Sequence, residues 1–463
     1  MNPSAPPRER LASVYQPDDP IQTLLNCYVL CESSFDRFFN LLQDEGRDLQ
    51  YCESTRAFAE LVDNAAPELQ IQDRLDALDD DDALIQCGAL LTALSRRVAR
   101  DFGQELGRYS RPYRSSAAFG DAPYWLSVRQ RGLAHRSLGR QPRKELHSTI
   151  RRFHEPLVVI PAAVNQFSLV RITANIGLDN LLAQRADEGR HRIAVGPLSY
   201  EADLRGTSAQ HEHRTLPDGF HLTAVEPLAV QEAALTEVLR LAYDSGISIL
   251  VLPELRMPPA LVTATQRFLR EQELGPDRGL LLVAAGSWHI ERDGVHVNRC
   301  TVLDHIGDVL WTHDKLREFE VTPENVAADP GLFAQIGVGE KGGFEAIARG
   351  EKLEFFESVL GRLAAAICIG FFSPEVAPLL QASRADIFLV PTMTPSVLDL
   401  ERCADTLVRT QHAFTFAANC GRVGRNASSF CRWPAARDSL GRLPIGKRLL
   451  ALDLSNISMY ALD

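Results

Sequence analysis

Short, continuous apolar runs constrain the fold of this chain more than any other feature of its sequence. Leu363–Ile367 consists of small and branched apolar residues, which suits a strand buried on both faces inside an α/β sheet. The run breaks at Gly370, and beyond it Ser373 suits a helix N-cap while Pro374 fits the first helical position. The pattern therefore predicts a strand, a sharp turn and a helix, with Cys368 at the turn.

Two charged residues end other predicted strands. Glu254 closes the apolar run 247–253, and Lys315 follows a short strand within 307–314. A carboxylate is rarely buried without a partner, so Glu254 either meets a cation or has its pKa raised for base work. Taken singly, each charge is typical of a solvated strand end, and an isolated buried cysteine is usually structural. Because ligands bind at strand ends in open α/β sheets, the combination with Cys368 indicates an active site.

The order Glu254, Lys315, Cys368 resembles the Glu-Lys-Cys triad of the nitrilase, or carbon–nitrogen hydrolase, superfamily. The resemblance covers roughly residues 190 to 460. Further matches are Arg192–Pro197 as the opening strand, Val230–Tyr243 as the helix before Glu254, Val283–Ser287 as the next strand, Gly294–Arg299 as a hairpin with Asn298, and Phe414–Asn419 as a later strand ending in Asn. The resemblance implies a four-layer α-β-β-α sandwich, and a homo-oligomer by analogy with the family.

The chain also departs from the family pattern. Nitrilases usually carry a Trp-Glu pair just after the nucleophile, whereas this chain has Ile369-Gly370, which weakens a nitrile-hydrolysing interpretation. The later motifs are degraded as well, at 408–411, 424–428 and 441–444. Inferences on substrate and interface that depend on those stretches are in doubt.

The resemblance implies a role for each triad residue. Glu254 would take the thiol proton, give it to the leaving amine and later activate water. Lys315 would stabilise the oxyanion and favour the thiolate, and the N–H of Ile369 would be the second oxyanion donor. Attack by Cys368 would leave a thioester.

Family members often have a second, structural glutamate between the lysine and the cysteine. Glu324 is our choice because it precedes a Pro-Gly pair, as the family's residue does, while Glu318 and Glu320 are rivals and an ordinary loop glutamate is an alternative. Three further residues are predicted to be pocket walls for the substrate: Phe371, Phe372 and Thr392.

The expected reaction is thiol-dependent hydrolysis of a nonpeptide carbon–nitrogen bond in an amide or N-carbamoyl compound. An acyltransferase that uses the same thioester is one alternative, and a partner-binding sensor or effector with a nitrilase-like domain is another. No cofactor and no metal are expected. Cys27 and Cys31 lie four residues apart on one predicted helix face, but without further ligands at metal-binding spacing they are core residues in our interpretation.

At 463 residues the chain is too long for one such domain. The predicted organisation is a disordered tail over 1–20, a helical N-terminal domain over 21–150, a linker with bridging strands over 151–190 and the hydrolase domain over 191–463. Apolar residues at helical spacing between 21 and 100 support the helical assignment.

The charge of the chain is unevenly distributed. Residues 96–152 carry thirteen Arg and one Lys against four acidic residues, in a chain whose net charge is −11. This segment either binds a protein or nucleic-acid partner or docks against the acidic remainder of the same protein, and the second interpretation is favoured because no nucleic-acid motif accompanies it.

The remaining composition bears on compartment. No apolar stretch approaches the roughly 18 residues that cross a bilayer, and the N-terminus lacks a signal-peptide core. The nine cysteines fall at no disulfide-like spacing, and a nucleophilic thiol must stay reduced. The sequence therefore predicts a cytoplasmic enzyme without a membrane segment.

Overall fold

The computed structural model describes most of the chain in two compact units, which are treated separately below. The described residues are 6–11, 13–16, 18–64, 68–75, 79–106, 111–128, 157–173, 176–198, 202–209, 219–275, 278–420, 428–434 and 440–463. Of these, the residues before Asn165 group with one unit and those from Asn165 onward with the other, although the two-residue strand Ala163–Val164 at the boundary pairs into a sheet of the second.

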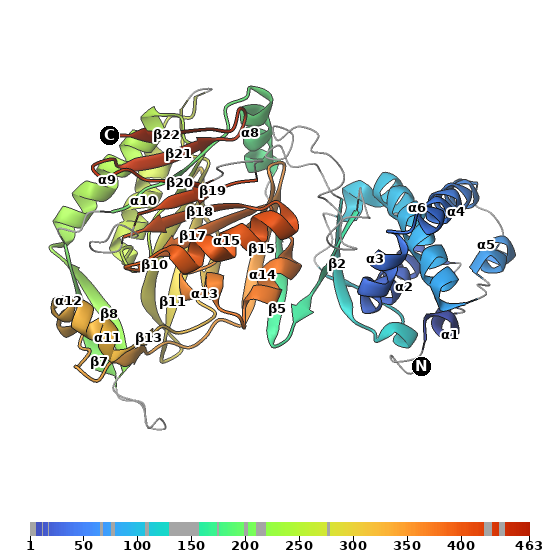
Figure 1. Ribbon diagram of the computed structural model, residues 1–463. Coiled ribbons are helices and arrows are strands. Elements are labelled where there is room, and N and C mark those ends of the chain that lie inside the picture. The colour runs from blue at the N-terminus through green and yellow to red at the C-terminus, as the bar shows by residue number, and fades with distance from the viewer. Residues whose placement is uncertain are drawn as a thin grey trace. The chain divides into compact units, whose positions relative to one another are not determined.

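The first unit is mainly helical, as the apolar spacing predicted (Figure 1). Its elements are α1 (Pro7–Leu11), α2 (Pro20–Ser33), α3 (Phe35–Leu41), α4 (Glu45–Asp63), α5 (Glu68–Leu75), α6 (Asp80–Leu106) and a three-stranded sheet of β1 (Tyr113–Arg114), β2 (Pro123–Val128) and β3 (Leu157–Pro161). The long helix α6 packs against α2 and α4. A Cβ at Gly88 of α6 would overlap the ring of Phe38 on α3, so glycine lets α6 and α3 approach closely.

Two expectations for this half of the chain need correction. The described part of 1–20 is not a disordered tail, because α1 is helical and Leu11 and Val14 are buried in the helical core. The segment 151–190 is not a separate linker either: β3 belongs to the first unit's sheet, while β5 (Phe167–Thr173) belongs to a sheet of the second.

The basic segment 96–152 lies largely outside the described residues. In its described part, arginines pair with carboxylates of the same unit: Arg97 with Asp101, and Arg100 with Asp63. These exposed pairs fit the interpretation in which basic residues face the protein's own acidic side chains.

Two large sheets form the second unit. The seven-stranded sheet has the order β12-β11-β10-β9-β6-β21-β22, in which β6, β9 and β10 are parallel. Its strands are β6 (Arg192–Val195), β9 (Ile249–Val251), β10 (Leu282–Arg292), β11 (Val295–Asp304), β12 (Val309–Asp314), β21 (Leu449–Asp453) and β22 (Ser458–Leu462).

The eight-stranded sheet has the order β20-β19-β18-β17-β16-β15-β5-β4, with β16, β17 and β18 parallel. Its strands, besides β5, are β4 (Ala163–Val164), β15 (Lys352–Ser358), β16 (Gly361–Ala365), β17 (Ile387–Thr392), β18 (Phe414–Asn419), β19 (Phe430–Arg432) and β20 (Leu440–Arg442).

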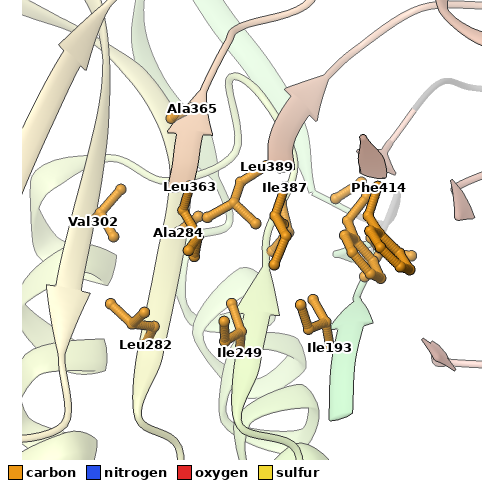
Figure 2. Close-up of a cluster of buried hydrophobic side chains, with 14 of the residues drawn as sticks. Ile193, Ile249, Leu282, Ala284, Val302, Leu363, Ala365, Ile387, Leu389 and Phe414 are labelled. Carbon is orange, nitrogen blue, oxygen red and sulfur yellow. The ribbon is translucent and has the colours of Figure 1, made fainter. Parts of the chain in front are cut away.

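The two sheets pack face to face. Ile249 and Leu282 of one sheet lie in a single buried cluster with Leu363, Ile387 and Leu389 of the other (Figure 2). Each fully buried side chain of this size contributes roughly 1.5–3 kcal/mol by leaving water. This cluster is the core that fixes the strand ends of both sheets relative to one another.

Helices cover the outer faces of both sheets. On the seven-stranded sheet, Leu250 and Val283 alternate with the inward residues and pack against Leu239 of α9 (Leu228–Asp244) and Leu261 of α10 (Pro259–Glu271). On the other sheet, α14 (Ala377–Ser383) lies against β15, and α15 (Leu398–Gln411) against β18 (Figure 1). The remaining helices are α8 (Ile176–Asp187), α11 (Pro323–Ala328), α12 (Pro330–Gln335) and α13 (Ile369–Phe372). The expected α-β-β-α sandwich is confirmed.

A third, smaller sheet was not anticipated. It has the order β13-β14-β8-β7, formed by β13 (Glu320–Val321), β14 (Gly343–Glu345), β8 (Gly219–Glu226) and β7 (Asp203–Ala209). Its apolar side chains form their own cluster with residues of α12 and with Leu255, the residue after Glu254. The small sheet therefore stands next to the predicted site.

Candidate active site

Cys368 sits at a strained turn between β16 and α13. Its N–H donates to the carbonyl of Pro391 at 2.9 Å, which keeps the chain alongside β17 to the end of that strand. Its φ of 44° and ψ of −115° lie in a region that non-glycine residues rarely adopt, at a cost on the order of 1–3 kcal/mol. The predicted strand and sharp turn around this cysteine are confirmed, but the helix start was misplaced. The helix begins at Ile369, Ser373 is its C-cap, and the following helix has Val376 as its N-cap, so Ser373 and Pro374 open no helix.

Glu254 and Lys315 meet in the same place, although 61 residues separate them in sequence. Glu254 follows β9 and Lys315 follows β12, and both side chains are almost completely buried. The Lys315 ammonium donates to Glu254 Oε1 at 2.7 Å, and the N–H of Met393 donates to Glu254 Oε2 at 2.9 Å. The carboxylate is therefore held from two sides while remaining on the wall of the cavity that Cys368 also lines.

A second glutamate binds Lys315, and it is Glu345. The Lys315 ammonium donates to Glu345 Oε2 at 2.6 Å, and the N–H of Phe319 donates to the same oxygen at 3.0 Å. Asn298, which the family resemblance singled out, bridges both acids by donating to Glu254 Oε1 at 3.0 Å and to Glu345 Oε1 at 2.7 Å. Two carboxylates thus share one ammonium in a buried cluster.

Glu324 does not reach this cluster. It is exposed in the first turn of α11, where Thr322 is the N-cap and Pro323 opens the helix. The Pro-Gly pair after it opens the next helix, α12, and so does not mark the lysine's partner. The rival Glu318 pairs with Arg349, and Glu320 is exposed in β13. Sequence reasoning missed Glu345 because it ends a strand of only three residues, too short to show a period.

His289 on β10 holds the other side of Glu345. The N–H of Leu222 donates to His289 Nδ1 at 2.7 Å, so that nitrogen must carry a lone pair. The neutral imidazole then bears its proton on Nε2, which lies 2.9 Å from Glu345 Oε1 and donates to it. This imidazole was not predicted, and its only sequence signal is a polar residue in an otherwise apolar stretch of strand.

Burial and charge set the protonation states. Burial raises the pKa of the Glu345 carboxyl, but the Lys315 ammonium and the hydrogen bond from His289 outweigh it, and the pKa is lowered. Burial lowers the pKa of Lys315, yet the carboxylates of Glu254 and Glu345 raise it above its usual value. Lysine and second glutamate therefore both remain charged near neutral pH.

The electrostatics around Cys368 favour its protonated thiol. Burial, and next the carboxylate of Glu254, raise the pKa of the Cys368 thiol to about 12. Lys315, the Thr392 hydroxyl and the N–H of Met393 favour the thiolate without reversing the shift. Since only the thiolate is a strong nucleophile, Cys368 could attack a substrate only with the help of a base.

A cavity of about 530 Å³ opens onto this cluster. Glu254, Lys315, Glu345 and Cys368 line it together. Its other wall is mostly apolar and comes from the small sheet, α12 and the segment after β17: Phe220, Phe319, Leu332, Phe333, Ile336 and Met393.

Four residues were predicted to serve as oxyanion donor or pocket walls around Cys368, and none of the three predicted pocket walls lines the cavity. Ile369 is the first residue of α13, so its N–H has no partner within that helix. Phe371 is buried against Phe388 beneath the sheet, with ring centroids 5.6 Å apart, and does not line the cavity. Phe372 lines a different hollow beside α14 and α15. Thr392 lies beside Cys368, and its carbonyl accepts the N–H of Glu254 at 3.4 Å, but it is not a cavity wall.

No group of three or more potential metal ligands occurs among the described residues. No helix in the described part of the chain is long and apolar enough to span a bilayer.

Comparison with known proteins identifies structures but no sequence relatives. No protein-family model matches the sequence, and no curated protein does. Among solved structures, a variant of an amidase from Nesterenkonia sp. AN1, with an acetamide moiety attached to its active-site cysteine, is 17% identical and has a TM-score of 0.36, covering 58% of this chain and 93% of its own. Nit3 of Saccharomyces cerevisiae, from branch 10 of the nitrilase superfamily, is 15% identical with a TM-score of 0.36, covering 56% of this chain and 89% of its own.

The architecture itself agrees with the sequence motifs. Two packed sheets flanked by helices carry Glu254, Lys315 and Cys368 beyond strand ends that face one cavity. The fold of residues 165–463 is accordingly nitrilase-like, the fold of the carbon–nitrogen hydrolase superfamily.

Proposed function

We propose that this protein hydrolyses a nonpeptide carbon–nitrogen bond of a small amide through a thioester on Cys368. The observation that carries the proposal is the convergence of a thiol, a carboxylate and an ammonium on one cavity large enough for a small substrate. Glu254 and Lys315 are in direct hydrogen-bond contact, and Glu345 holds the ammonium in place.

The first half-reaction forms the thioester. Glu254 takes the thiol proton as Cys368 Sγ attacks the amide carbon, and the carbonyl oxygen becomes an oxyanion. The Lys315 ammonium and the N–H of Ile369 stabilise that charge, a contribution on the order of 3 kcal/mol per donor. Glu254 then gives its proton to the departing nitrogen as the C–N bond breaks, releasing ammonia or an amine.

The second half-reaction regenerates the enzyme. Glu254 takes a proton from water, which attacks the thioester carbon. Collapse of the new tetrahedral intermediate releases the carboxylic acid and returns the proton to Cys368. An added amine that intercepted the thioester would instead yield a new amide, so the product distinguishes hydrolysis from acyl transfer.

Intact-protein mass spectrometry after brief exposure to a panel of primary amides tests this function. The wild type is expected to gain the mass of an acyl group. Glu254→Gln should gain it more slowly, because the thiol loses its base, and should then retain it longer, because water is no longer activated. Cys368→Ala should gain nothing, while Cys403→Ala, which removes another thiol of the same unit away from the cavity, should behave as the wild type. Turnover by a folded Cys368→Ala variant would sink the proposal.

A further inference from the structure

The charges around the cavity are unequal. Among the described residues that line the cavity, Lys315 is the only one with a positive charge. Its ammonium is already bound by Glu254 and Glu345. An anionic group on a substrate would therefore be buried without a free partner, which is costly. The described part of the cavity suits neutral and cationic ligands.

One carboxylate on the cavity wall is left over from the catalytic cluster. Asp329 joins α11 to α12, and its Oδ1 accepts the N–H of Leu332 at 3.1 Å as the N-cap of α12. Among the described residues, no Lys, Arg or His forms an ion pair with it. Asp329 shares the wall with the apolar side chains of Leu332, Phe333 and Ile336.

We propose, building on the function above, that the preferred substrate is an amide whose acyl chain is apolar and ends in a positive charge. The chain would pack against the apolar wall of α12, and its ammonium would meet the Asp329 carboxylate. Amides whose acyl part ends in a carboxylate, including N-carbamoyl amino acids, are then disfavoured, which narrows the substrate class expected from sequence.

Three amides of six carbons each test this charge preference: ε-aminocaproamide, hexanamide and adipamate. The far end of the chain is positive in the first, neutral in the second and negative in the third. We expect kcat/KM to fall in that order, by about fivefold at each step, the upper range for one partly solvated charge pair.

Asp329→Asn isolates the residue, because asparagine caps a helix as well as aspartate does. It should abolish the advantage of ε-aminocaproamide over hexanamide. Glu324→Gln is the matched control: it removes one negative charge from neighbouring α11 but faces solvent, so it should leave the order unchanged. An unchanged order in Asp329→Asn, or a preference of the wild type for adipamate, would overturn the inference.

Binding to Cys368→Ala separates this inference from the proposed chemistry. Calorimetric titration of that variant with the three amides measures recognition without turnover. If the wild type turns over none of them, the hydrolase proposal fails. If Cys368→Ala binds all three equally, the charge preference fails even when hydrolysis is observed.

Discussion

At the scale of single residues, His289 determines how Glu345 meets Lys315. Because Leu222 donates to its Nδ1, the imidazole presents a proton on Nε2 to Glu345 Oε1. The carboxylate is thereby fixed by His289 and Asn298 on one oxygen and by Lys315 on the other. In the proposed reaction His289 is a positioning residue, which acts through Glu345 and Lys315.

Two amide substitutions at His289 separate its two hydrogen bonds. His289→Gln places an amide N–H where Nε2 lies, and should keep kcat within about threefold of the wild type. His289→Asn retains only an acceptor near Nδ1, so kcat should fall about 10–100-fold, the equivalent of one lost hydrogen bond to a charged group. Steady-state kinetics across pH checks this, since a less firmly held Glu345 also narrows the pH–rate profile of His289→Asn. If His289→Asn instead kept the higher kcat, the role of His289 would be limited to accepting the N–H of Leu222.

The sequence predicted part of this site for a physical reason. Glu254, Lys315 and Cys368 each follow a strand whose apolar run is visible in the sequence, and strand ends gather at one edge. Glu345 and His289 have no such marker, because their roles depend on which side chains meet after the sheets pack. Glu324 was chosen for a Pro-Gly pair that turned out to start a helix.

At the scale of elements, the bulge in β10 places Glu254. The register of β10 against β11 shifts between Ala284 and Ser287, and Gly286 within the bulge has a φ of 56°. A Cβ there would overlap the carbonyl oxygen of Pro253, the residue that precedes Glu254. Glycine is therefore needed for the strand to pass close behind Glu254.

Gly286→Ala should lower both stability and activity. The positive φ costs roughly 1–2 kcal/mol for alanine, and the overlap with Pro253 adds about 1–3 kcal/mol. Displacing Glu254 by an ångström would reduce kcat by about 100-fold. Denaturant unfolding and kinetics measure the two effects. Gly294→Ala in the β10–β11 turn is the control, because its φ is 80° but a Cβ there meets nothing within 4 Å; equal losses in both variants would contradict the role given to Pro253.

The large sheets were readable in the sequence and the small one was not. Ile387–Thr392 and Phe414–Asn419 are fully buried and mostly apolar, so the sequence pattern predicts that they are strands and nearly where they end. The small sheet contains strands of two and three residues, Glu320–Val321 and Gly343–Glu345, between glycine-rich turns. Strands this short are held by tertiary contacts, which no local pattern reports.

At the scale of the whole molecule, a buried histidine makes the second unit sensitive to acid. His191 Nε2 lies 2.6 Å from the carbonyl of Leu182 on α8 and donates to it. Burial, together with the nearby Arg185, lowers the pKa of His191 from 6.5 to about 4, although the Leu182 carbonyl opposes this shift. The unfolded chain therefore binds this proton more readily than the folded one.

The sign of the pH effect follows directly. The contribution of neutral His191 to the free energy of unfolding is fully present above pH 6.5. It is lost as pH falls from 6.5 towards 4, by up to about 3 kcal/mol. His191→Gln can keep the bond to Leu182 without titrating, so its free energy of unfolding should decline less across this window and match the wild type more closely at pH 8. Urea unfolding at several pH values measures it. Parallel pH curves for the two proteins would show that His191 does not titrate on unfolding.

The pairing of two carboxylates with one ammonium determines how the proposed reaction depends on ionic strength. When Cys368 passes its proton to Glu254, the negative charge moves within the buried cluster, and its total does not change. The potential outside the protein hardly alters, so mobile ions in solution have no reason to rearrange during the step. Ionic strength then acts on the arrival of a charged substrate at Asp329 and leaves the bond-making step untouched, which divides recognition and chemistry in this one cavity into a salt-sensitive and a salt-insensitive part.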